Sequence, residues 1–114
     1  LHRATNLPVI ITDRDHVIAV SGMPRKDAID KHISAELETL MEDRENYIAS
    51  PETKALYPLN DRDREAGIAF PIIGGGDVAG TVVLMLNTDG SMPTQTEIKL
   101  VSVAASFLGK QTEE

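Results

Sequence analysis

The chain contains no cysteine and no tryptophan, and it has only two phenylalanines and two tyrosines. Without cysteine it can form no disulfide, no thiolate metal ligand and no thiol nucleophile, and this absence fits the reducing interior of a cell. We therefore expect a cytoplasmic protein. Because aromatic residues make up only 4% of the chain, its core must be aliphatic, and few rings are present on which bases or sugars could stack.

Positive charge is also scarce, since 11 Lys and Arg stand against 18 Asp and Glu and the formal net charge is -7. Surfaces that bind nucleic acid or anionic lipid gather lysine and arginine, so we expect this chain alone to bind neither DNA nor a membrane. No apolar run reaches the length of a transmembrane helix. The first residue is Leu1 rather than Met and no signal-peptide pattern follows, so we expect a fragment of a longer protein.

The composition suits one globular domain over residues 1–114, with 41% hydrophobic and 25% charged residues. Two apolar runs, Leu7–Thr12 and Val17–Ser21, flank a polar connection at 13–16 and predict an antiparallel hairpin. Apolar residues at helical spacing then predict a helix from about Ile33 to Glu45, with Ser34 as a candidate N-cap.

The segment Asn46–Glu65 has no clear periodicity and is interrupted by prolines, so we predict a loop-rich connection with one short helix at about Glu52–Leu56. Two strands follow, at Gly67–Ile73 and Val78–Leu86, around a turn at Gly74–Asp77. This order of elements predicts an α+β domain, with an antiparallel sheet and the helices on one side of it.

Two further features place these strands in the sheet. The second strand is apolar on both faces in its later half, which predicts a central position. Pro71 has no N–H to donate to a neighbouring strand, so this part of the first strand should lie at an edge or a bulge.

The C-terminal helix is the best specified element. A capping-box pattern at Thr94–Glu97 predicts its start, and it should run to about Gln111. Its polar residues form one narrow stripe, and apolar residues cover the rest of its surface. A sheet would bury only part of that surface, so another helix or another subunit should cover the remainder. The residues we expect at such an oligomer interface are Leu100, Val103, Ala104 and Phe107.

Four sets of residues are candidates for chemistry, and each has a simpler interpretation: the glycine-rich Gly74–Asp77, the carboxylates Asp13 and Asp15, the histidines His2, His16 and His32, and the serines Ser21 and Ser91. The glycine-rich segment lacks the Lys-Ser/Thr pair of a phosphate-binding loop. The carboxylates suit a turn, and the histidines lack the close spacing of zinc ligands. Neither serine has the pattern of flanking glycines that surrounds a nucleophilic serine. We therefore expect no enzyme, no metal site and no cofactor.

Several blocks, in the same order along the chain, resemble the C-terminal half of the stage V sporulation protein T family of transcriptional regulators. They are Asp13–Gly22, Lys26–Asp27 and Ile33–Ser34 and, more loosely, Gly67–Ile72, Gly80–Val83 and Val103–Leu108. The resemblance implies a GAF domain, which is a sensory module with a central antiparallel sheet, helices packed on it and a pocket for a small molecule. It also implies pairing through bundles of terminal helices, as a dimer or tetramer, and an N-terminal DNA-binding domain that is absent from this chain.

In GAF domains the pocket lies between the sheet and the irregular connection ahead of the third strand. On this chain the resemblance therefore points to residues 46–65, and the candidate lining residues are Ser21, Tyr57, Ile68 and Phe70. The alternative is that Phe70 is a core residue and Tyr57 a surface residue. Two functions stay open: a domain that couples an unidentified effector to DNA binding, and a purely structural oligomerisation module without a ligand.

Overall fold

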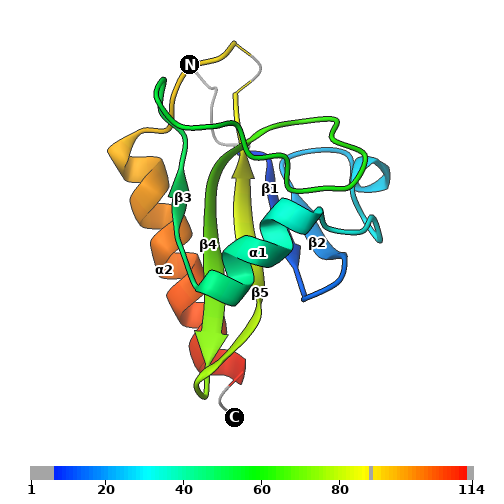
Figure 1. The fold of residues 1–114 in the computed structure, drawn as a ribbon, viewed down its shortest axis with the longest axis vertical. Helices are drawn as coiled ribbons and strands as arrows, with labels where there is room; N and C mark the ends of the chain where they lie inside the picture. Colours follow the sequence, from blue (N-terminus) through cyan, green and yellow to red (C-terminus); the bar gives the residue numbers. More distant parts are fainter. Residues whose placement is uncertain (1–6, 88, 113–114) are drawn as a thin grey trace.

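The computed structural model describes residues 7–87 and 89–112 and contains one five-stranded antiparallel sheet, with the strand order β2-β1-β5-β4-β3 (Figure 1). This confirms the α+β class and the central position predicted for β5. The elements are β1 (Val9–Thr12), β2 (Val17–Ser21), a short 3₁₀ helix η1 (Arg25–Asp27), α1 (Ala35–Asp43), β3 (Tyr47–Ile48), β4 (Ala66–Gly74), β5 (Asp77–Met85) and α2 (Gln95–Thr112).

Both predicted hairpins are present. Between β1 and β2, the Asp13 side chain accepts hydrogen bonds from the backbone N–H groups of Asp15 and His16, at 2.7 and 2.8 Å, and so closes the turn. Between β4 and β5, Gly75 and Gly76 both have positive φ, at 61° and 87°, which is the backbone of a two-residue hairpin turn. The glycine-rich segment is therefore a turn, as predicted.

The edge position predicted for Pro71 is confirmed locally. β4 lies between β5 and β3, but β3 pairs only with Ile68 and Ala69. At Pro71 the strand has a partner on the β5 side alone, where it lies opposite Thr81. Because no strand lies beside Pro71 on the β3 side, the missing N–H of proline costs no interstrand hydrogen bond there.

Helices cover both faces of the sheet, so the prediction that they pack on one side is wrong (Figure 1). Successive residues of β5 point in opposite directions: Val83 belongs to the core under α1, whereas Val82 and Leu84 belong to the core under α2. Both faces of this strand are apolar, so a helix has to pack on each face to bury its side chains. The α1 core also contains Ile10, Leu37 and Met41, and the α2 core contains Ile68, Val101 and Ala105.

Helix α1 is shorter than the predicted span of 33–45. The Ser34 side chain caps it by accepting from the Leu37 N–H at 3.1 Å, as predicted, so helical structure begins only at Ala35. Ile33 instead forms an isolated bridge with Leu59. At the other end Arg44 adopts the left-handed conformation, with φ 56°, and terminates the helix.

The middle of the chain departs furthest from prediction. The short helix expected at about Glu52–Leu56 is absent, and the prediction is wrong. The chain makes a turn at 50–53, where the Thr53 N–H donates to the Ser50 carbonyl at 3.1 Å, and has no regular secondary structure at 54–58. Leu56 is buried in the α1 core, and its carbonyl accepts from the Ala66 N–H at 2.8 Å. Neither β3 nor η1 was predicted, and each has three residues or fewer.

Helix α2 begins with the predicted capping box. The Thr94 hydroxyl accepts from the Glu97 N–H at 3.1 Å, and the Glu97 carboxylate accepts from the Thr94 N–H at 3.0 Å. Near its C-terminal end the helix approaches β4 so closely that a Cβ at Gly109 would lie 2.3 Å from the Ile73 carbonyl oxygen. Glycine at this position therefore permits α2 to lie directly on the sheet.

Candidate functional site

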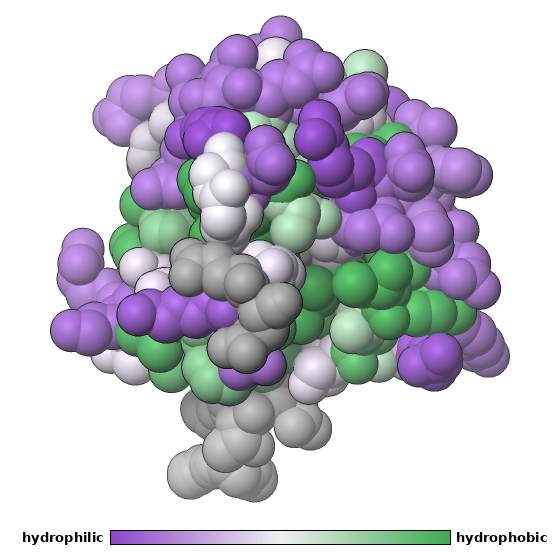
Figure 2. All heavy atoms as spheres, turned by 90° about the horizontal axis from the view of Figure 1, so that it is seen from below, coloured by the Kyte–Doolittle hydropathy of each residue, from purple (hydrophilic) through white to green (hydrophobic). Residues whose placement is uncertain are grey.

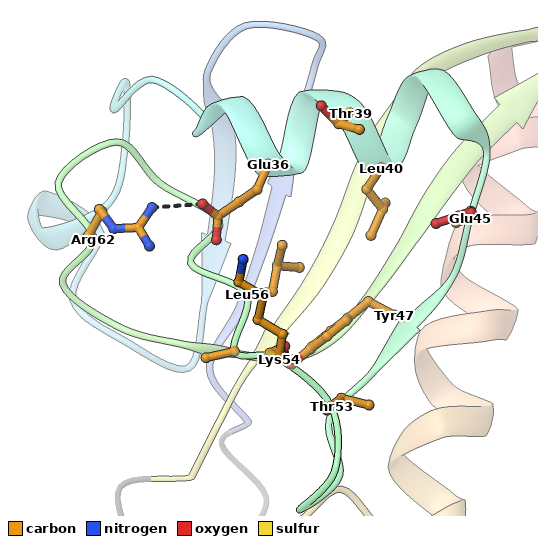
Figure 3. A pocket seen from close by; sticks show the side chains of 10 residues that line it. Glu36, Thr39, Leu40, Glu45, Tyr47, Thr53, Lys54, Leu56 and Arg62 are labelled. Atoms are coloured by element: carbon orange, nitrogen blue, oxygen red, sulfur yellow. Dashed lines mark hydrogen bonds and ion pairs between the residues drawn. The ribbon is translucent and has the colours of Figure 1, made fainter.

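A cavity of about 480 Å³ opens on the α1 side of the sheet, between that helix and the irregular segment 46–65 (Figure 3). Glu36, Thr39 and Leu40 of α1 form one wall, and residues 53–56 face them across the cavity. Glu45, Tyr47 and Arg62 complete the lining. The cavity adjoins the irregular segment to which the family resemblance pointed.

A carboxylate and a guanidinium are paired at one end of this cavity. One oxygen of Glu36 (Oε1) accepts from Arg62 Nη1 at 2.7 Å, and the other (Oε2) accepts from the backbone N–H of Tyr57 at 2.7 Å. The Arg62 guanidinium also stacks 4.5 Å above the centre of the Tyr57 ring. Partial burial disfavours the charged form of Glu36, but the two hydrogen bonds and the neighbouring Arg62 and Lys54 charges outweigh it and hold the pKa of Glu36 below its ordinary value of 4.5.

The start of α1 fastens the irregular segment in place. The Ser34 hydroxyl donates to the Tyr57 carbonyl and the Ser34 N–H donates to the Pro58 carbonyl, at 2.5 and 2.8 Å. Arg62 has a left-handed backbone, with φ 52°, which costs a non-glycine residue about 1 kcal/mol. Its pairing with Glu36 and stacking on Tyr57 hold it there, so the segment and the helix end form one unit.

The cavity has charges at both ends and an apolar floor. Figure 3 shows Lys54 reaching toward the end that holds Glu36 and Arg62, while Glu45 stands at the opposite end. Leu40 and Leu56 lie between them and are buried. These charged residues were not predicted, because Glu36 and Glu45 belong to the helix expected at 33–45 and Arg62 to the loop-rich segment 46–65, and no local pattern links the two. Only the fold brings the two together.

The four predicted ligand-lining residues do not share a cavity. Ser21 is exposed at the end of the edge strand β2, and Tyr57 meets the site through its backbone and the face of its ring. Ile68 is fully buried under α2, and Phe70 is half-buried on the same side, near Ile98. The sheet thus separates Ile68 and Phe70 from the cavity beside α1. Their role as ligand contacts stays a prediction.

On the opposite side of the molecule, α2 exposes an apolar ridge. Leu100, Val103 and Phe107 leave 53%, 56% and 61% of their surface accessible, although all three are large hydrophobic residues. The fourth predicted interface residue, Ala104, is half-buried and lines an apolar groove of about 210 Å³ beside the ridge, together with residues of β1 and β5. Figure 2 shows apolar residues reaching the surface in patches among hydrophilic ones.

The described residues contain neither a cluster of metal-ligand side chains nor a membrane-spanning helix. No three His, Asp or Glu side chains within 7–87 and 89–112 gather as metal ligands, and His2 lies outside the described residues. Over the same part of the chain, no helix is long and apolar enough to cross a membrane.

Comparison with known proteins gives two matches. Residues 1–113 match the family described as "Stage V sporulation protein T C-terminal, transcription factor". The chain is also 39% identical over 108 residues to Stage V sporulation protein T of Bacillus subtilis (strain 168). This match covers 93% of the chain but 59% of that relative, so the chain spans little more than half of the relative's length. The family description is that of a transcription factor, not of an enzyme, in agreement with the sequence analysis.

Proposed function

This chain belongs to the family of stage V sporulation protein T C-terminal domains, and from this premise we propose that it is the sensing and oligomerising domain of a sporulation transcription factor. In this proposal a small effector occupies the cavity beside α1, and the ridge on α2 pairs with a second copy of the chain. DNA is bound by a separate N-terminal domain in the same cytoplasmic protein. The five-stranded antiparallel sheet with a helix on each face supports a GAF-like architecture.

The observation that carries this proposal is that the cavity and the ridge lie on opposite faces of one central strand. Val83 of β5 packs in the core under α1, and its neighbours Val82 and Leu84 pack in the core under α2. Because close-packed cores transmit small displacements, a ligand that shifts α1 would bias the position of α2. By reciprocity, the assembly state of the ridge would then alter the affinity for the ligand.

Self-association is supported by the ridge itself. Three large apolar residues at spacings of three and four form one exposed stripe on a helix whose opposite side is buried. A two-fold axis beside this stripe would place it against its own copy, which is the commonest geometry of homodimers, and a second such contact would give a tetramer. The net charge of -7 supports the assignment of DNA binding to a different domain.

Native mass spectrometry of the chain tests the assembly, with Val103→Glu as the disruptive variant and Ser102→Glu on the polar stripe as the matched control. We expect the wild-type chain and the control to be dimers or tetramers at micromolar concentration. The ridge variant should raise the dissociation constant about tenfold or more, because a charge would be buried without a partner. A monomeric wild-type chain would contradict the proposal. A mobility shift of DNA by this chain at physiological salt would contradict the separate DNA-binding domain.

A purely structural oligomerisation module is the second candidate. It is favoured by one observation: without a ligand, both oxygens of the Glu36 carboxylate already accept hydrogen bonds, one from Arg62 and one from the Tyr57 N–H. Thermal unfolding against a panel of metabolites separates the two functions, because a ligand that binds only the folded chain raises the melting temperature. No shift with any compound, in a chain that still assembles, would favour the structural module.

A further inference from the structure

We propose that the cavity beside α1 binds a short peptide of two or three residues with both termini free. Its carboxylate would lie at the end with Lys54 and Arg62, and its ammonium would lie at the end with Glu45. This inference rests on the sensing function proposed above and names the ligand class for that same cavity.

The carboxylate end is defined by two cations. Among the described residues, the Lys54 ammonium takes part in no ion pair, and the Arg62 guanidinium makes a single side-chain hydrogen bond, to Glu36. An arginine has five N–H donors, so most of the N–H groups of the Arg62 guanidinium are available to a second acceptor. A guanidinium binds a planar carboxylate well, because the two groups can form two parallel hydrogen bonds.

The ammonium end is defined by Glu45. This residue follows the left-handed Arg44 that ends α1, and its carboxylate forms no ion pair with any described residue. Its N–H is held by the Leu40 carbonyl at 3.1 Å, which fixes the backbone at this end of the cavity. Figure 3 shows it across the cavity from Arg62. A cationic group is what a lone exposed carboxylate attracts.

The spacing of the two ends favours a peptide over a single amino acid. Glu36 and Asp43, the last residue of α1, are seven positions apart, which is about 10.5 Å at the helical rise, and Glu45 lies two residues beyond the helix end. Side chains reach inward from both ends and shorten this gap. An extended di- or tripeptide spans about 7 to 10 Å, whereas one amino acid spans about half of the shorter figure. The buried Leu40 and Leu56 between the ends would contact an apolar side chain of the peptide.

Glu36 acts in this arrangement as an internal competitor for Arg62. Its carboxylate occupies the guanidinium in the free chain, at 2.7 Å, and a peptide carboxylate would share or displace it. Replacing Glu36 with Gln removes this negative charge but keeps an oxygen that can accept from the Tyr57 N–H. We therefore expect Glu36→Gln to bind the peptide about threefold more tightly, with Glu42→Gln, on the same helix but outside the cavity, as the unchanged control.

The test is a titration of the isotope-labelled wild-type chain with Ala-Leu-Ala, followed by two-dimensional amide NMR. Two capped peptides serve as matched controls: the N-acetyl peptide lacks the ammonium and the C-terminal amide lacks the carboxylate. We expect the free peptide to shift the amides of Leu40 and Ala55 but not that of Val82 on the opposite face. Each cap should weaken binding about threefold, in line with exposed ion pairs.

Variants then assign the two ends. Glu45→Gln should weaken binding of the free peptide to the level of the N-acetyl peptide and leave the N-acetyl peptide unaffected. Lys54→Gln should weaken both. Equal affinity for free and capped peptides would overturn the assignment of the ends. No shift with free di- or tripeptides, while another compound shifts the same amides, would overturn the peptide class but leave the sensing function standing.

Discussion

The variant Gly109→Ala tests how closely α2 packs against β4 of the sheet. In solvent-exposed helices this change stabilises, by about 1 kcal/mol, because alanine has the higher helix propensity. Here the added Cβ would lie 2.3 Å from the carbonyl oxygen of Ile73 and 3.1 Å from its carbon. Both are backbone atoms of β4 and cannot rotate away.

The end of α2 must therefore move about 1 Å outward to restore an ordinary contact of 3.4 Å or more. Such overpacking costs about 1 to 3 kcal/mol, and a rigid backbone neighbour places this site at the upper end. After the gain in helix propensity is subtracted, we expect Gly109→Ala to lower the free energy of unfolding by about 2 kcal/mol. Gly74 faces the same contact, since a Cβ there would lie 2.2 Å from the Gly109 carbonyl oxygen.

Urea unfolding followed by circular dichroism measures this change, with Ser106→Ala on the exposed side of α2 as the matched control. The control should be neutral or slightly stabilising, whereas Gly109→Ala should lower the urea midpoint by about 1 M for a chain of this size. Repeating both at tenfold higher chain concentration separates any contribution of self-association. If Gly109→Ala proves as stable as the wild-type chain, the close approach of α2 to β4 is refuted.

Three further predictions concern hydrogen bonds and charge. The Thr12 and Thr81 hydroxyls share a buried hydrogen bond of 2.7 Å, so Thr12→Val should lower the free energy of unfolding by about 1 to 2 kcal/mol. The double variant with Thr81→Val should lose less than the sum of the singles, and strict additivity in urea unfolding would count against the bond. Because folding lowers the pKa of Glu36, its contribution to stability is complete above pH 4.5 and is lost as the pH falls through the lower folded value. Glu36→Gln should therefore make the acid unfolding curve shallower below pH 4.5, and an unchanged curve would contradict the pairing with Arg62. Glu97→Ala removes half of the capping box and should lower the melting temperature in a calorimetric scan, with a cost of about 0.5 to 1 kcal/mol, whereas no change would show that the cap contributes nothing.

Much of the fold could be predicted because its signals are local. Asp13 closes its own turn, Gly75 and Gly76 supply the positive φ of theirs, and Thr94 with Glu97 caps α2 through bonds that span three residues. Each of these depends on neighbours in the sequence and not on the rest of the molecule. β3 could not be found in this way, because two residues become a strand only when β4 is beside them.

The residues that line the cavity could be predicted far less well than the fold. The family resemblance placed a pocket near residues 46–65, and the cavity lies there, but Ile68 and Phe70 were expected in it and lie across the sheet. Side chains alternate between the two faces of a strand, so the sequence of β4 shows which residues share a face. It does not show which helix covers that face, because this depends on the register and on the packing of distant segments. Glu36 and Arg62, 26 positions apart, meet only because the segment folds back over the start of α1.

By itself, the sequence determined that this is an acidic α+β chain with an aliphatic core, two hairpins and a capped C-terminal helix that has more apolar surface than one sheet can bury. These properties follow from composition, turn chemistry and periodicity, which act over a few residues. Only the tertiary structure decided that the helices cover opposite faces, that glycine seats α2 on β4, and that opposite charges line the ends of one cavity. Each of these depends on which distant segments come into contact, and that choice is made by burial of the whole chain and not by any local pattern.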